Sequence, residues 1–192
     1  GQQNQLQSKG FIEFCDKNGI SHDMYQKAKT IPRFIRFKPG SESELDVHKF
    51  EQSLTHQSAN GTEEPPVKKQ KMVNIRPVSW LPEQFMFYSM DSDTNIAYST
   101  YYKKGLVYGL DISSAMAVFA LHPQPNDKIL DMCCAPGAKL CLLADYISQS
   151  SGSNQFYITG VDVNIDRLNK CKNILKKYKV DNVRLVLADG TK

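Results

Sequence analysis

The second half of the chain alternates short apolar segments with amphipathic ones, and this alternation leaves few folds open. The segments KILD, FYITGVDV and VRLVL have the apolar character of buried parallel strands, and a helix-like stretch separates each from the next. Parallel strands need a long crossover between them. The order strand, helix, strand, helix, strand therefore predicts the first half of a Rossmann-like, doubly wound α/β sheet over residues 101–192.

A smaller α+β module is predicted at residues 29–100, after a partly helical extension at 1–28. The segment IPRFIRF alternates in the way of a strand with one face in water. Ser41 and Glu44 fit a capping box for a helix that ends near residue 54. Residues 58–71 hold few aliphatic side chains, so we expect a mobile insertion there, and MVNIRPVSWLP and FMFYSM are two further strand candidates.

Composition excludes some classes of protein. No apolar run is long enough to cross a bilayer, so we expect no membrane association. The five cysteines show no spacing typical of metal ligands, which predicts reduced thiols, no metal site and a nuclear or cytoplasmic location. The net charge is +4, and the whole basic excess lies after residue 100, which permits a nucleic-acid partner without requiring one.

The turn after the first parallel strand is the candidate binding site. It reads Asp131-Met-Cys-Cys-Ala-Pro-Gly-Ala-Lys139, and a ligand of such a sheet binds outside the carboxyl ends of the strands. We expect the N–H groups of residues 135–139 to face that crevice and to favour a carboxylate. Asp162 ends the next strand, where a carboxylate can accept both ribose hydroxyls, and Asp189 follows the third strand, where it can face an adenine amino group.

The composition of this turn separates the possible adenosine ligands. A dinucleotide site needs several glycines so that the backbone can approach a pyrophosphate, and here Gly137 stands between Pro136 and Ala138. S-adenosylmethionine has no pyrophosphate and tolerates a fuller loop. Its carboxylate suits the helix start, and Asp131 can organise its amino end. The residues therefore favour S-adenosylmethionine over other nucleotides.

The run HPQPNDKILDMCCAPGAKLCLLA closely resembles the cofactor motif of the Sun-domain (Fmu-type) RNA cytosine-5 methyltransferases. Other segments resemble that family in the same order along the chain: Pro32-Arg-Phe-Ile-Arg36, Trp80-Leu-Pro82, Gly105 to Ser114, Gly160-Val-Asp162, and Asp189-Gly-Thr191. Departures from the family pattern are Leu110, Cys134, Ala138 and Leu140.

The resemblance implies a cofactor site for S-adenosylmethionine, formed by Cys133, Cys134, Ala135, Pro136, Gly137, Ala138, Lys139, Asp162 and Asp189. It implies that the first module is RRM-like and that the partner is RNA, either tRNA or rRNA. In the family the two catalytic cysteines follow the fourth and fifth strands, and this chain ends after the third. We therefore expect no catalytic residue here, no activity of this piece alone, and the remainder of the same polypeptide as a partner.

Several alternatives stay open. The chain could be a non-catalytic RNA-binding or scaffold protein with a methyltransferase-like fold, or part of a small-molecule or protein methyltransferase. Arg33 and Arg36 are candidates for RNA contacts, and residues 68–71 form a short basic run that could direct nuclear import. The lysines of the second helix are either a solvated face or a track for an RNA backbone: Lys170, Lys172, Lys176, Lys177 and Lys179.

Overall fold

The computed structural model describes residues 9–21, 31–41, 46–55, 73–91, 94–151 and 156–192. These residues fall into two compact units, one within Gly1–Pro32 and the other within Arg33–Lys192. The first unit contains helix α1 (Lys9–Lys17), which buries Cys15. The insertion expected at 58–71, with its basic run, lies outside the described residues.

Four antiparallel strands form the first sheet of the second unit, in the order β2-β3-β1-β4. Their bounds are β1 (Arg33–Phe37), β2 (Arg76–Pro77), β3 (Phe87–Met90) and β4 (Val107–Gly109). Helix α3 (Val47–Thr55) follows β1, the short helix η3 (Glu83–Phe85) precedes β3, and α4 (Thr100–Lys103) precedes β4. The antiparallel sheet thus extends past the boundary predicted at residue 100, because β4 pairs with β1.

Helix α3 begins later than the capping box predicted. The backbone N–H of Lys49 donates to the Asp46 carboxylate at 3.0 Å, so Asp46 caps the helix. This bond and the neighbouring Lys49 ammonium lower the pKa of Asp46. The Ser41 hydroxyl instead donates to the Lys38 carbonyl oxygen, and Glu44 lies outside the described residues. The prediction of Ser41 as the cap is therefore wrong.

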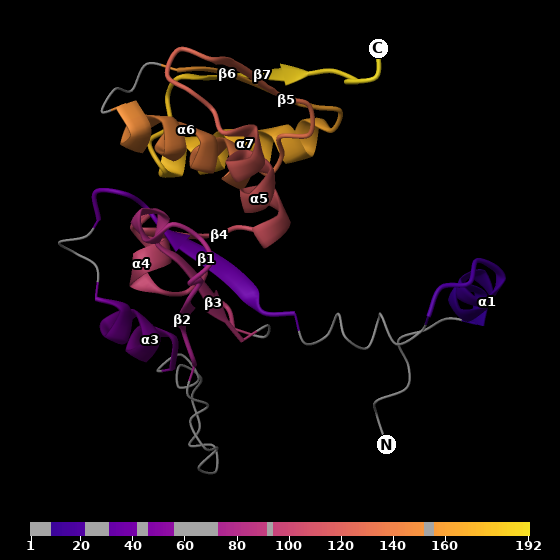
Figure 1. Cartoon of the computed structure of the whole chain (residues 1–192), viewed down its shortest axis with the longest axis horizontal. Helices are drawn as coiled ribbons and strands as arrows, with labels where there is room; N and C mark the ends of the chain where they lie inside the picture. The colour runs from indigo at the N-terminus through magenta and orange to yellow at the C-terminus, as the bar shows by residue number, and fades with distance from the viewer. Residues whose placement is uncertain (1–8, 22–30, 42–45, 56–72, 92–93, 152–155) are drawn as a thin grey trace, which may run out of the picture. The chain divides into compact units, whose positions relative to one another are not determined.

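The second sheet is parallel, in the order β5-β6-β7, as the alternation predicted. Its strands are β5 (Lys128–Asp131), β6 (Tyr157–Asp162) and β7 (Val183–Leu187), and the helices are α5 (Ile112–Leu121), α6 (Ala138–Ser151) and α7 (Ile165–Lys177). Asp111 caps α5 as expected, since its carboxylate accepts the Ser113 N–H. Figure 1 shows α5, α6 and α7 in a layer between the two sheets.

One hydrophobic core joins the two sheets through that helix layer. Phe87 and Tyr108 of the antiparallel sheet belong to the same buried cluster as Leu140 and Ile147 of α6. The opposite face of the antiparallel sheet, with Ile35, packs on α3 and α4 in a second cluster. Strand β1 was predicted to have one face in water. From Ile35 to Phe37 it is instead buried on both faces.

Candidate functional site

The turn between β5 and α6 is held against the neighbouring strand by backbone hydrogen bonds. The Cys134 N–H donates to the Val161 carbonyl oxygen at 2.9 Å. The Ala135 N–H donates to the Asp162 carboxylate at 3.2 Å. The ends of β5 and β6 and the turn thus form one connected rim. The N–H of residue 135 points at Asp162, and Pro136 has no N–H, so only residues 137–139 can offer the donors predicted for the crevice.

Asp131 lies at the end of β5, and its two carboxylate oxygens differ in their hydrogen-bond partners. One oxygen accepts from the Lys139 ammonium at 2.7 Å and from the Cys133 N–H at 3.2 Å. The other oxygen, Oδ2, is buried and has no hydrogen-bond partner among the described residues. A buried acceptor without a donor is costly, so this atom is suited to a donor that the chain does not supply.

Asp162 lies at the end of β6 with a side chain only 2% exposed. Besides the Ala135 N–H, its carboxylate accepts the Asn164 N–H at 3.1 Å. The Arg167 guanidinium lies 3.6 Å from Oδ2 and donates to the Ala135 carbonyl oxygen at 2.7 Å. Arg167, in the first turn of α7, therefore holds the segment between β5 and α6 in place, a role that the sequence did not predict.

Small residues let the turn pack tightly on α7 and β6. Gly137 has a φ of +110°, and a Cβ at this position would lie 2.9 Å from the Cys171 sulfur. A Cβ at Gly160 would lie 2.9 Å from the Cys134 sulfur. The Cys134 side chain is thus packed behind the turn. Burial raises the pKa of Cys134, and it raises the pKa of Cys171 to about 12.

The third carboxylate, Asp189, accepts hydrogen bonds from the N–H and hydroxyl of Thr191, which lower its pKa. Its neighbour Gly190 lies against Met132 in the turn, because a Cβ there would be 3.1 Å from the Met132 side chain. The segment after β7 therefore reaches the same rim. Cys133 and Pro136 are exposed there, and Ala138 and Lys139 are half-buried.

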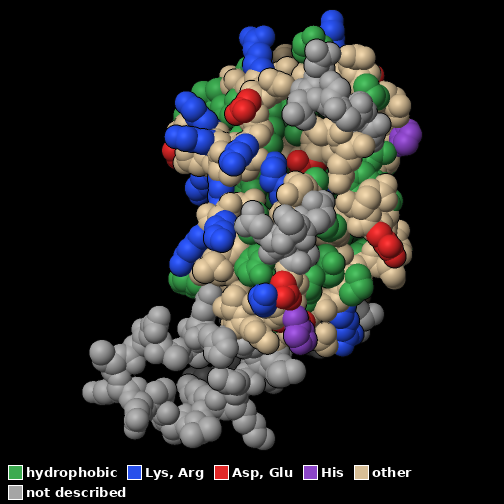
Figure 2. Space-filling view, turned by 90° about the vertical axis from the view of Figure 1, so that its left-hand side faces the viewer, with side chains coloured by type: hydrophobic (Ala, Val, Ile, Leu, Met, Phe, Trp, Pro, Cys, Tyr) green, Lys and Arg blue, Asp and Glu red, His purple; other side chains and the backbone are tan. Residues whose placement is uncertain are grey.

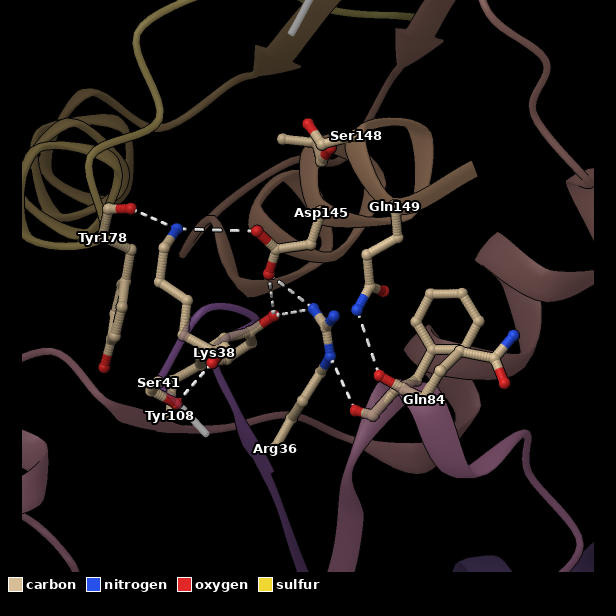
Figure 3. A network of polar contacts seen from close by, with 11 residues as sticks. Arg36, Lys38, Ser41, Gln84, Tyr108, Asp145, Ser148, Gln149 and Tyr178 are labelled. Atoms are coloured by element: carbon tan, nitrogen blue, oxygen red, sulfur yellow. Dashed lines mark hydrogen bonds and ion pairs between the residues drawn. The ribbon is translucent and has the colours of Figure 1, made fainter. Parts of the chain in front are cut away.

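A buried polar network links the antiparallel sheet to α6 (Figure 3), and the sequence analysis missed it. The Arg36 guanidinium, fully buried, donates to the Asp145 carboxylate at 2.6 Å and to the Tyr108 hydroxyl at 2.6 Å. Its Nε donates to the Phe85 carbonyl oxygen at 2.9 Å. Burial raises the pKa of Tyr108 well above its usual range. The proposal that Arg36 contacts RNA is wrong, because the side chain is sealed inside the core.

Lys38 extends this network toward α7. Its ammonium lies 3.5 Å from the second Asp145 oxygen and donates to the Tyr178 carbonyl oxygen. No single segment carries a sequence signal for such a network, because its partners are separated by about a hundred positions along the chain. Within the described ranges, no cluster of metal-ligating side chains occurs and no helix is long and apolar enough to span a membrane.

The chain is similar to known RNA methyltransferases over part of its length. Residues 118–192 match a family model described as 16S rRNA methyltransferase RsmB/F. The 28S rRNA (cytosine-C(5))-methyltransferase of Mus musculus is 34% identical over 119 residues, which are 62% of this chain and 14% of that protein. The tRNA (cytosine(72)-C(5))-methyltransferase of Pyrococcus horikoshii is 32% identical over 91 residues, which are 47% of this chain and 22% of that protein. The chain therefore spans less than a quarter of the length of these relatives.

Solved structures share the fold. The crystal structure of PH0851 has a TM-score of 0.63 at 18% identity and covers 100% of this chain and 41% of that one. A methyltransferase homologue from Pyrococcus horikoshii has a TM-score of 0.58 at 21% identity, covering 95% and 57%. The α/β methyltransferase architecture is thereby confirmed. The resemblance to RNA cytosine-5 methyltransferases is confirmed by the sequence matches.

Proposed function

We propose that this chain forms the S-adenosylmethionine-binding part of an RNA (cytosine-5) methyltransferase. The observation that carries the proposal is the rim between β5 and α6. There, the buried oxygen Oδ2 of Asp131 has no donor among the described residues, and α6 begins with N–H groups that have no acceptor within the helix. An amino acid has one group for each of these needs, an ammonium and a carboxylate. The resemblance of the same residues to the family's cofactor motif points to the same ligand.

The amino-acid end of the cofactor fits Asp131 and the start of α6. An ammonium donates to Asp131 Oδ2, while the Lys139 ammonium already neutralises the other oxygen. The carboxylate accepts from the N–H groups at Ala138 and Lys139, the first residues of α6, where the helix dipole favours negative charge. In this arrangement Lys139 acts on Asp131 rather than on the cofactor directly.

The sugar end fits Asp162 on one condition. A carboxylate can accept about four hydrogen bonds, so the protein donors on Asp162 leave room for ribose hydroxyls. The side chain is 2% exposed, whereas Arg167 beside it is 52% exposed. Ribose binding therefore requires Arg167 to turn away from Asp162 Oδ2. Asp189 completes the proposed site at the adenine, half-buried at the end of β7.

The bound cofactor supplies an electrophilic methyl group, and the protein must supply a thiolate to activate cytosine. Among the described cysteines, the exposed thiol is that of Cys133, which lies at the rim. Cys134, Cys141 and Cys171 are buried, and burial raises the pKa of each. A raised pKa keeps the thiol protonated and weakly nucleophilic. In this proposal the residues of the rim bind the cofactor, and the catalytic thiols come from outside the rim.

The antiparallel sheet serves as the RRM-like module of this proposal. Its elements follow the order strand, helix, strand, strand, helix, strand, which is that of a ferredoxin-like unit. In an RRM the exposed sheet face stacks bases on aromatic side chains. Here that face packs on the helix layer, with Phe87 4% and Tyr108 3% exposed. RNA therefore contacts other surfaces of this unit.

Binding of isotope-labelled S-adenosylmethionine to the full chain tests the proposal. We expect binding to the unaltered chain, and its loss in Asp162→Ala and in Asp131→Asn, because each removes an acceptor from the rim. Asp181→Ala is the matched control, since Asp181 is exposed and precedes β7 at the opposite end of the sheet. Unchanged binding in Asp162→Ala would remove that carboxylate from the site.

A non-catalytic RNA-binding or scaffold role is the second candidate, favoured by the buried thiols at the rim. Both candidates expect no methyl transfer by this chain alone. They differ when a polypeptide that supplies catalytic cysteines is added to the chain. Transfer of labelled methyl groups to cytosine in RNA identifies the enzyme, whereas cofactor-independent RNA binding without transfer identifies the scaffold.

A further inference from the structure

Seven lysines lie at the end of α4 and along the solvent-facing side of α7, two elements that contact each other. We name this surface the lysine strip; it consists of Lys103 and Lys104 at the end of α4 and of Lys170, Lys172, Lys176, Lys177 and Lys179 on and after α7. All are exposed except Lys177, which is half-buried. Lys172 and Lys176 are one helical turn apart, about 6 Å along α7. The strip therefore runs along the helix instead of forming a single point of charge.

Close contacts bring α4 and the end of α7 together. The Lys177 ammonium lies 3.1 Å from the centre of the Tyr102 ring. A Cβ at Gly105 would lie 3.0 Å from the Lys177 carbonyl oxygen and 3.8 Å from the Tyr178 ring. The Tyr178 hydroxyl donates to the Val107 carbonyl oxygen at 2.9 Å. The lysines at 103 and 104 are adjacent in sequence to these contacts, so the fold joins two basic segments that are some seventy positions apart.

The charge of the strip is not neutralised within the described part of the chain. Five lysines elsewhere have a carboxylate within 4 Å, whereas no ion pair with a described residue is seen for Lys17 or Lys128; the five are Lys9, Lys38, Lys49, Lys139 and Lys192. None of the seven strip lysines does so with a described residue. Figure 2 views the side where α4 and the end of α7 lie, and it shows lysine and arginine side chains gathered along one edge with few carboxylates among them.

Two simpler explanations cover only part of the strip. Lysines in the last turn of a helix stabilise it by offsetting the dipole, which accounts for Lys103 of α4 and for Lys176 and Lys177 of α7 but not for Lys170 or Lys172. A basic helix that lies on a membrane keeps an apolar face free for the lipid. The apolar face of α7 is already used, because Leu168, Cys171 and Leu175 are buried in the core. An extended polyanion fits the strip better than a bilayer.

We propose that the lysine strip binds the sugar–phosphate backbone of RNA without reading its sequence. The proposal rests on the proposed function, since it names the surface that the RNA substrate contacts outside the cofactor rim. Lysine ammonium groups bind phosphates as point charges and release counterions, so this binding weakens steeply with salt. The buried face of the antiparallel sheet leaves an exposed basic surface of this kind as the contact for RNA.

Salt-dependent RNA binding by the full chain tests the proposal. The probes are a fluorescein-labelled 20-nucleotide uridine strand and a labelled RNA hairpin, measured by fluorescence polarisation between 50 and 200 mM KCl. The test variant carries Lys103→Gln, Lys104→Gln, Lys172→Gln and Lys176→Gln. The control variant carries Lys9→Gln, Lys17→Gln, Lys49→Gln and Lys128→Gln, which remove the same charge from other elements. Thermal melting confirms that both variants remain folded.

We expect the test variant to lose about tenfold or more in affinity at 50 mM KCl, and its salt slope to fall by roughly 0.7–0.9 per lost phosphate contact. The control variant keeps the slope of the unaltered chain. Equal losses in the two variants would overturn the proposal, because the binding would then follow net charge alone. Loss of binding to phosphatidylserine vesicles without loss of RNA binding would overturn it in favour of a lipid surface.

Failure of this proposal is separable from failure of the proposed function. The strip variant is expected to bind labelled S-adenosylmethionine as well as the unaltered chain does, because the ion pairs of the rim carboxylates are made by Lys139 and Arg167, which lie outside the strip. Asp162→Ala is expected to keep the full salt slope for RNA. A strip variant that loses both ligands indicates a folding defect, which the melting control detects.

Discussion

Arg36 carries a fully buried guanidinium whose charge is balanced by the carboxylate of Asp145 on α6. Asp145→Asn leaves that charge in the core without its counterion, and we expect the free energy of unfolding to fall by about 3–5 kcal/mol. Urea denaturation measures it. Arg36→Met with Asp145→Leu removes both charges and should be more stable than Asp145→Asn, since packing replaces the pair. Lys49→Gln is the surface control, expected to leave the midpoint unchanged.

Gly137 occupies a backbone conformation that side chains rarely adopt, in contact with Cys171. We expect Gly137→Ala to destabilise the chain by roughly 1–3 kcal/mol, because φ stays positive and the added methyl group meets the sulfur. Cofactor affinity should fall with it, since the turn must shift. Ala138→Gly is the companion variant, one position into α6; preserved cofactor binding in Gly137→Ala would contradict this account of the turn.

The thiols of the second unit differ in burial. Burial raises the pKa of Cys141 and Cys171 to about 12, so both stay protonated as the pH rises from 7 to 10. Cys133 is exposed. We expect iodoacetamide at pH 8 to label Cys133 and to spare the two buried thiols, as read by mass spectrometry of tryptic peptides. Rapid labelling of Cys171 in the folded chain would show that the turn opens.

Helix α7 begins with a cap that also supports the rim. The Asn164 side chain accepts the Arg167 N–H at 3.0 Å, and asparagine is one of the residue types that are common at the N-cap of a helix. Asn164→Ala should cost about 1 kcal/mol of stability, and cofactor affinity should fall because the start of α7 carries Arg167, whose bond to the Ala135 carbonyl oxygen holds the turn while its contact with Asp162 opens for the ribose. Asn173→Ala, exposed on the same helix, is the control for both readings. Equal cofactor affinity in the two variants would show that the cap of α7 does not support cofactor binding at the rim.

The elements of the second half were predictable because their signals are local. Apolar strands, a Pro-Gly turn and the Asp111 cap each lie within a few residues, and the parallel order followed from them. The start of α3 was not predictable in this way. Ser41 and Asp46 are both residue types that cap helices well, and the sequence does not show that Asp46 is the one that does so. Arg36 was misread for a related reason, since a buried ion pair and an exposed cationic side chain look alike in sequence.

The rim was predictable in part. The sequence placed Asp131, Lys139 and Asp162 near one another, and the structure joins them through the turn. It did not indicate that Asp162 would be only 2% exposed, or that Arg167 would hold the turn from α7. Both facts depend on how a helix packs against a neighbouring strand, which no local pattern records.

The two sheets share one core, so we expect them to unfold together. Phe87 and Tyr108 from one sheet and Leu140 from the helix layer belong to the same buried cluster as Ile158 of the other sheet. Hydrogen exchange followed by mass spectrometry should therefore give β1 and β6 the same free energy of opening in low denaturant. Asp145→Asn should lower both values equally. Earlier opening of β1 alone would show that the antiparallel sheet detaches from α6.

The pairing of Arg36 with Asp145 also limits how this gene product can be cut for laboratory use. A boundary drawn between the sheets would leave a guanidinium and several aromatic rings in solvent on one fragment, and an unpaired carboxylate on the apolar surface of the other. Neither fragment is expected to stay monomeric when expressed. Truncations intended for crystallisation should therefore keep Arg33–Lys192 together.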